Sequence, residues 1–182
     1  MKISALLLGT TLLLVPAAAI ADSPQEFLHK ALQVDNSEIM LGRLAQERAM
    51  NPGVRDFGRT LENDHSQARN DVLGVGRRFG VRANRDIAPE ARQERDKLTG
   101  MRGRDFDREF VTYMVNDHRK DIGDFRDESR ERHGAVSDLA RRQLPTLQKH
   151  LDLAMALNGQ LDRQGDRRDD RRDDRRDDRR GR

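Results

Sequence analysis

Four long stretches of this chain place apolar residues at alternating three- and four-residue steps, over residues 27–49, 54–79, 106–125 and 139–157. This spacing follows the 3.6-residue period of an α-helix and predicts four amphipathic helices. The 182 residues suffice for one domain with a core of its own. With one Tyr, no Trp and no Cys, the composition favours packed helices over a sandwich of strands. We therefore expect a single all-α domain.

Local signals indicate where these helices begin and end. Ser23-Pro24-Gln25-Glu26 combines a capping box with Pro at the first helical position, so the first helix should begin there. Asn51-Pro52 should end it and cap the second helix, which Gly80 should stop. The short turn predicts that these two helices are antiparallel neighbours. A short charged helix is expected at residues 89–98 of the connector that follows.

Residues 1–21 have the parts of a secretory signal peptide. Lys2 precedes an apolar run, and the segment ends on the small-x-small pattern Ala19-Ile20-Ala21. The run is shorter than the ~20 residues that span a bilayer, which disfavours a membrane anchor. We expect cleavage before Asp22 and a periplasmic or secreted protein without a membrane span after cleavage.

The C-terminal residues 162–182 are dominated by an Arg-Arg-Asp-Asp repeat. Its period of four would place like charges at i and i+4 of a helix, so we expect a disordered tail. Two interpretations of the tail stay open: contact with an anionic envelope surface, and a solvating appendage. Lys2 and the tail account for the net charge of +3. The body, residues 22–161, is therefore neutral, and no nucleic-acid partner is expected.

Ionisable side chains interrupt the apolar face of each long helix. They are Glu38, His65, His118 and His150, each 13 to 16 residues from the adjacent turn. At ~1.5 Å per residue, they should lie level with one another near mid-bundle. One hypothesis is a self-satisfied hydrogen-bond network that fixes helix register. The other is a metal site, because imidazole and carboxylate suit zinc, iron, copper or manganese.

Two identical tripeptides, Asn63-Asp64-His65 and Asn116-Asp117-His118, suggest that the two helical hairpins are related copies. With these tripeptides, four further stretches resemble the bacterial exported family called domain of unknown function 4142 (DUF4142). These stretches are Ser37–Gly42, Ala49–Val54, Phe106–Phe110 and Leu144–Leu151. The resemblance covers residues 27–157. It implies a ferritin-like antiparallel four-helix bundle of unassigned activity, here with a short extra helix in the connector and a disordered C-terminal tail.

The ferritin-like resemblance also implies a ligand pattern: a Glu from each of two helices and Glu-x-x-His from each of the other two, around two iron ions. Glu38 and the segment Glu62–His65 match parts of it, but Leu147 stands where a Glu should precede His150. A mononuclear site, or none, fits better than an iron pair. The candidate metal ligands are Glu38, Glu62, Asp64, His65, Asp117, His118, Asp121 and His150.

The chain lacks the motifs of the common enzyme classes. Without Cys there is no thiol nucleophile, and the glycines form neither a phosphate loop nor a dinucleotide fingerprint. No catalytic or cofactor-binding residue is assigned, and a non-enzyme is favoured. We expect a periplasmic protein that binds a transition metal ion (zinc, iron, copper or manganese) or supports envelope stress tolerance. The alternative is a non-catalytic structural or interaction module whose polar layer only fixes helix register. The oligomeric state stays open.

Overall fold

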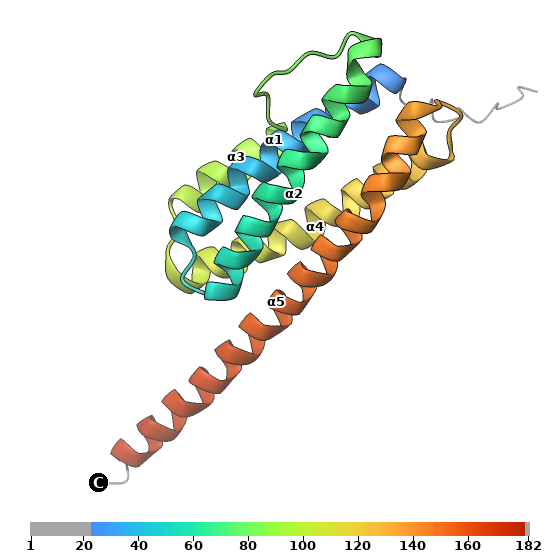
Figure 1. Cartoon of the computed structure of the whole chain (residues 1–182). Coiled ribbons are helices and arrows are strands. Elements are labelled where there is room, and N and C mark those ends of the chain that lie inside the picture. The colour runs from blue at the N-terminus through green and yellow to red at the C-terminus, as the bar shows by residue number, and fades with distance from the viewer. Residues whose placement is uncertain (1–22, 181–182) are drawn as a thin grey trace, which may run out of the picture.

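The structure, a computed structural model, describes residues 23–180 and the side chains of residues 23–164. The predicted signal peptide lies outside the described residues. Within them the chain forms five α-helices and one 3-10 turn, with no β-strand, as Figure 1 shows. The elements are α1 (Pro24–Arg48), α2 (Pro52–Gly76), η1 (Arg77–Phe79), α3 (Pro89–Thr99), α4 (Gly103–Arg130) and α5 (Ala135–Arg180). The predicted all-α class is confirmed.

The helix boundaries follow from local chemistry. The Ser23 hydroxyl accepts a hydrogen bond from the Glu26 amide at 3.3 Å, and Glu26 accepts one from the Ser23 amide at 2.9 Å, which completes the predicted capping box. Asn51 caps α2 by accepting from the Gly53 amide at 2.8 Å. Gly80 ends η1 with a left-handed backbone, φ 74°. The short charged helix predicted in the connector is α3.

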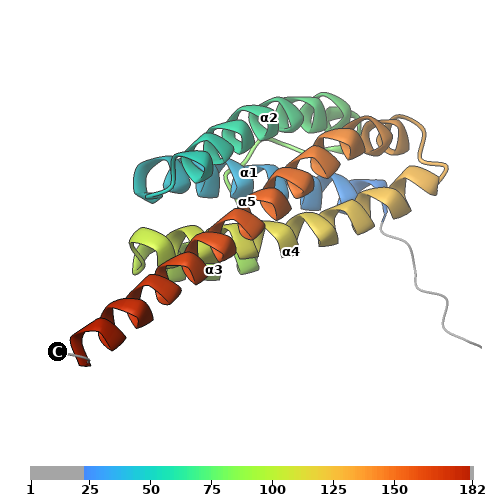
Figure 2. The same cartoon turned by 90° about the horizontal axis from the view of Figure 1, so that it is seen from below.

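The four long helices pack as two hairpins. Figures 1 and 2 both show α1 beside α2 and α4 beside α5, with α2 also against α5. α1 and α2 approach so closely at Gly42 and Gly58 that a Cβ on either glycine would lie 2.6 Å from the carbonyl oxygen of the other. Side chains such as Leu28, Leu61 and Phe106 fill the core and are fully buried. The helix contacts are those of a bundle.

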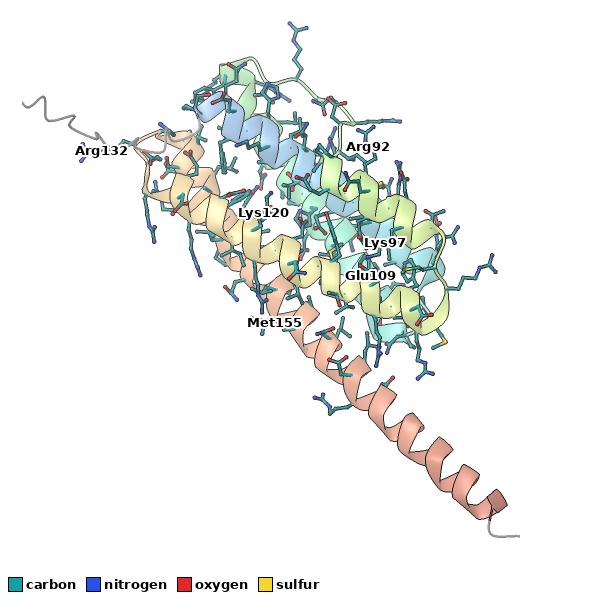
Figure 3. All side chains as sticks on the ribbon, turned by 180° about the vertical axis from the view of Figure 1, so that it is seen from behind. Arg92, Lys97, Glu109, Lys120, Arg132 and Met155 are labelled. Carbon is teal, nitrogen blue, oxygen red and sulfur yellow. The ribbon has the colours of Figure 1, made fainter. Side chains whose placement is uncertain are left out.

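Polar contacts fix how the two hairpins sit together. The Asp107 carboxylate at the start of α4 accepts hydrogen bonds from the amides of Met50 and Asn51, at 2.9 and 2.8 Å, in the turn between α1 and α2. Lys97 and Glu109, labelled in Figure 3, form an ion pair between α3 and α4. The bundle is therefore closed at the end where the first hairpin turns. None of the described helices has the length and hydropathy needed to cross a bilayer.

The last helix is the longest of the described helices. The backbone of α5 stays helical through Arg180 and extends past the bundle (Figure 1). The side chains of the repeat lie outside the described residues, and the predicted disorder of residues 162–182 stays a prediction. The repeat continues a helix that already exists, so it does not bear the cost of nucleation. Leu161 is the last buried residue among the described side chains, at the predicted end of the bundle.

Candidate metal centre

Three histidines converge inside the bundle, one each from α2, α4 and α5. His65, His118 and His150 are 3%, 0% and 0% exposed. One ring nitrogen of each lies within 4.8 Å of one ring nitrogen of each of the other two. The ring centroids are 5.3 to 6.0 Å apart. The predicted convergence of the three imidazoles is confirmed.

Each imidazole has one nitrogen held by an oxygen atom. His65 Nδ1 lies 2.9 Å from Asp35 Oδ1, and His150 Nε2 lies 2.9 Å from Asp64 Oδ2. His118 Nδ1 lies 3.0 Å from the backbone carbonyl oxygen of Met114, one helical turn earlier. These contacts fix the three ring orientations. They leave one nitrogen of each ring without an oxygen partner: His65 Nε2, His118 Nε2 and His150 Nδ1.

The nitrogens of His118 and His150 that have no oxygen partner face each other, and neither of them carries a proton. A carbonyl oxygen only accepts, so the Met114 contact places the proton of His118 on Nδ1. Partial burial opposes ionisation of Asp64, but the hydrogen bond from His150 lowers the Asp64 pKa overall, so His150 carries its proton on Nε2. His118 Nε2 and His150 Nδ1, 3.3 Å apart, then both present lone pairs. His65 Nε2 is likewise buried without a hydrogen-bond partner in the described chain.

The histidines are held in the uncharged form that binds metals. Burial lowers the pKa of His65 to about 4, that of His118 to about 3 and that of His150 to about 4. Mutual repulsion between the imidazolium forms lowers the latter two further. At neutral pH all three rings are therefore free bases, and no excess proton bridges His118 and His150.

A second set of predicted ligands is buried nearby but stays outside the histidine group. Glu38 on α1 is fully buried, and neither carboxylate oxygen has a hydrogen-bond partner among the described residues. Burial raises its pKa well above the usual value, and the charges of Asp117 and Asp121 on α4 raise it further. Burial also raises the pKa of Asp121. Among the described residues, only the three histidines form a group compact enough to hold an ion.

Glu62 and Asp64, also predicted as ligands, are engaged differently. Glu62 accepts hydrogen bonds from Arg43 Nε and Gln46 Nε2, both at 2.7 Å, on the α1 side of α2. These contacts lower its pKa. Asp64 is half-buried and contacts the His150 ring. Asp64 therefore orients a histidine, while Glu62 is occupied by its α1 partners.

Sequence reasoning missed Asp35, which is 3% exposed and holds His65. Burial raises the pKa of its carboxyl group well above the usual value. A signal was present in the sequence: Asp35 lies four residues after Ala31 and three before Glu38, both on the apolar face of α1. The adjacent Val34 also continues the apolar spacing, so the pattern alone does not select Asp35.

A cavity borders two of the three histidines. It has a volume of about 160 Å³ and lies mainly between α1, α2 and α5. His65 and His150 line it together with their carboxylate partners Asp35 and Asp64. Two of the three imidazoles therefore adjoin a cavity large enough for an ion and several water molecules.

Comparison with known proteins identifies the family. A family model described as domain of unknown function DUF4142 matches residues 12–157, so the chain belongs to this family. No curated protein matches it significantly. A similar crystal structure is that of a protein described as "putative secreted protein DUF305 from Streptomyces coelicolor", with a TM-score of 0.63 and 16% identity over 78% of this chain and 95% of that chain. At this identity the likeness shows a shared fold.

Proposed function

We propose that this DUF4142 protein binds a first-row transition metal ion, of the zinc or copper class, through the three histidines. The observation that carries the proposal is the pair of lone-pair nitrogens, His118 Nε2 and His150 Nδ1, that face each other 3.3 Å apart in the core. Two buried acceptors at this distance repel unless a cation lies between them. His65 Nε2 supplies the third nitrogen.

The spacing of the nitrogens suits such an ion. Metal–nitrogen bonds of about 2.0–2.1 Å in a tetrahedral site separate two ligand nitrogens by roughly 3.3–3.4 Å. The nitrogens of His118 and His150 already have this separation. The nitrogen of His65 lies within 4.8 Å of each of them, so a small inward movement of His65 would complete the site. Three neutral imidazoles favour copper and zinc over manganese or magnesium. The fourth coordination position would be left for water or an exogenous ligand.

The oxygens around the histidines support the same function. Asp35, Asp64 and the Met114 carbonyl each hold the ring nitrogen that does not face the centre of the group. Carboxylate or carbonyl partners of this kind orient metal-binding histidines and raise their basicity. In this proposal the buried Glu38 and Asp121 and the partly exposed Asp117 are not direct ligands but a separate carboxylate layer.

We further propose that the bundle is a ferritin-like fold adapted to one ion and that it acts in the periplasm or outside the cell. The predicted signal peptide supports this location, as does the description of the similar DUF305 protein as secreted. Metal binding there would contribute to envelope stress tolerance by sequestering a redox-active or toxic ion.

Titration of the untagged, metal-free protein with Zn²⁺ and Cu²⁺ tests the proposal. We expect one ion per chain, and at least ~100-fold weaker binding after His65→Ala, His118→Ala or His150→Ala. His29→Ala is the matched control, because His29 is exposed on α1 outside the group. Circular dichroism establishes that each variant is folded. Absence of binding by the folded wild-type chain, or equal loss in the control, would leave a structural module whose polar layer fixes helix register.

A further inference from the structure

A second, larger cavity lies on the other side of the first hairpin. Its volume is about 830 Å³, and its walls come from α1, α2, α3 and the connector between η1 and α3. It shares no lining residue with the cavity that reaches the histidines. Ligand pockets for small organic molecules have volumes of about 300–1,000 Å³, so this one has the size of a binding site.

Hydrogen bonds hold the connector over this cavity. Asn36 Nδ2 on α1 donates to the Asp86 carbonyl at 2.9 Å, and the Ala88 amide donates to Ser37 Oγ at 3.0 Å. Arg69 on α2 donates from Nη2 to the Asn84 carbonyl at 3.0 Å. The connector is thus tied to both helices of the hairpin, and the cavity beside it has a defined shape.

One part of the lining is apolar. Ile39, Met40 and Leu44 on α1 and Ile87 in the connector contribute side chains to the cavity and are all partly exposed. Met40 and Leu44 also pack against the bundle core, so this surface continues the core outward. A ligand with an apolar body would remove the exposed area from water.

The rest of the lining carries an excess of positive charge. Four arginines contribute to it, Arg43, Arg69, Arg85 and Arg95, against the single carboxylate of Glu47. Arg43 is paired with Glu62 and Arg95 with Asp96.

The remaining two arginines, Arg69 and Arg85, form no ion pair among the described residues, and they outnumber the single carboxylate of Glu47 in the lining. Arg69 donates to the neutral oxygens of Asn36 and Asn84, at 2.8 and 3.0 Å. Arg85 has no ion pair within the described part of the chain and is exposed at the connector. Guanidinium groups beside an apolar surface complement a carboxylate or phosphate attached to a hydrocarbon.

We infer that this cavity binds an amphipathic organic anion, with its acidic head group at Arg69 and Arg85 and its hydrocarbon body on Ile39, Met40, Leu44 and Ile87. The inference is independent of the metal centre. Both the free acid and the same head group in a lipid would present this chemistry, and the experiment below includes an arm for each.

Calorimetric titration of the full chain with decanoate tests the inference, with decanol as the uncharged counterpart. We expect decanoate to bind with a micromolar dissociation constant and decanol to bind at least about tenfold more weakly, because only decanoate can pair with the guanidinium groups. Arg85→Gln should weaken decanoate binding about tenfold, and Ile87→Ser should weaken the binding of both decanoate and decanol. Arg92→Gln is the matched control, since Arg92 is exposed on α3 outside the lining (Figure 3).

The outcomes separate the alternatives. Co-sedimentation with vesicles of phosphatidylglycerol that is lost in Arg85→Gln but kept in Arg92→Gln would assign the anion to a lipid; binding of decanoate alone would assign it to a free acid. Both results support the site. The inference is overturned by decanoate binding no tighter than decanol, by equal weakening in Arg85→Gln and Arg92→Gln, or by no binding of either probe to the folded chain.

Discussion

The same tripeptide, Asn-Asp-His, occurs at residues 63–65 of α2 and at residues 116–118 of α4, yet the two copies act differently. In the first, Asp64 accepts a hydrogen bond from His150 of another helix, and His65 binds Asp35 of α1. In the second, His118 binds the backbone of its own helix at Met114. Both histidines nevertheless direct a nitrogen to the same centre.

The difference comes from what lies opposite each aspartate. Asp64 faces the imidazole of His150, which donates a hydrogen bond and lowers the Asp64 pKa. Asp117 has the carboxylates of Glu38 and Asp121 as neighbours, and its charge raises the pKa of both. The aspartate of the first copy therefore belongs to the surroundings of the histidine group, and the aspartate of the second belongs to the carboxylate layer. Identical local sequence thus acquires its role from the helix packed against it.

The comparison is tested most strongly by neutralising each aspartate in turn. Asp64→Asn removes the negative charge that orients His150, and loss of such a partner weakens metal binding by about 10–100-fold. Asp117→Asn leaves every histidine hydrogen bond in place, so its effect should stay below about threefold. Zn²⁺ titration of both variants and the wild type measures the difference. Equal losses would show that the two copies have the same role.

An intermediate effect is expected for Glu38→Gln, which removes a buried charge from the carboxylate layer. The pKa of Glu38 is raised in the folded state, so ionisation above the unfolded value of 4.5 destabilises the fold progressively as the pH rises. The glutamine variant should therefore be more stable than wild type by about 1–2 kcal/mol at pH 8 and equally stable at pH 4. Urea unfolding of the metal-free proteins at the two pH values measures this.

The histidines should make stability depend on pH in the opposite direction in the same unfolding experiment. Their folded pKa values of about 3 to 4 lie below the unfolded value of 6.5, so their stabilisation is present above pH 6.5 and is lost as the pH falls toward 4. This acid-side loss should persist in Glu38→Gln. A glutamine variant less stable than wild type at pH 8 would show that the ionised Glu38 carboxylate has a stabilising partner.

The smallest effect is expected from making the first copy resemble the second at the position before the tripeptide. Glu62 precedes Asn63, whereas Val115 precedes Asn116. Glu62→Val removes the contacts to Arg43 and Gln46 at the protein surface, so the free energy of unfolding should fall by less than ~1 kcal/mol. Zn²⁺ affinity should stay unchanged. A drop of tenfold or more would restore Glu62 as a ligand.

Glu62 and Asp35 show where prediction of the site from the sequence stopped. The spacing Glu-x-x-His places Glu62 and His65 within ~60° of each other on α2, which favoured Glu62 as a ligand. Its carboxylate instead contacts Arg43 and Gln46 on α1, and the spacing does not encode these partners. Asp35 was overlooked although it binds His65, because the apolar spacing along α1 also accommodates Val34. The helical period predicts which few residues lie on the buried face of a helix. Which of these residues contacts a histidine depends on the neighbouring helix.

The helices, most of their ends and the common depth of the three histidines can be predicted from the amino-acid sequence, because capping, apolar period and rise per residue act over a few residues of one chain segment. Which imidazole nitrogens are held by oxygen, and which converge, depends on packing between helices. Asp35 meets His65 when α1 packs on α2, and Asp64 meets His150 only when the two hairpins pack together. The same packing leaves Glu38 without a hydrogen-bond partner in the described core. Protonation and coordination chemistry depend on these contacts between helices, and no local pattern encodes them.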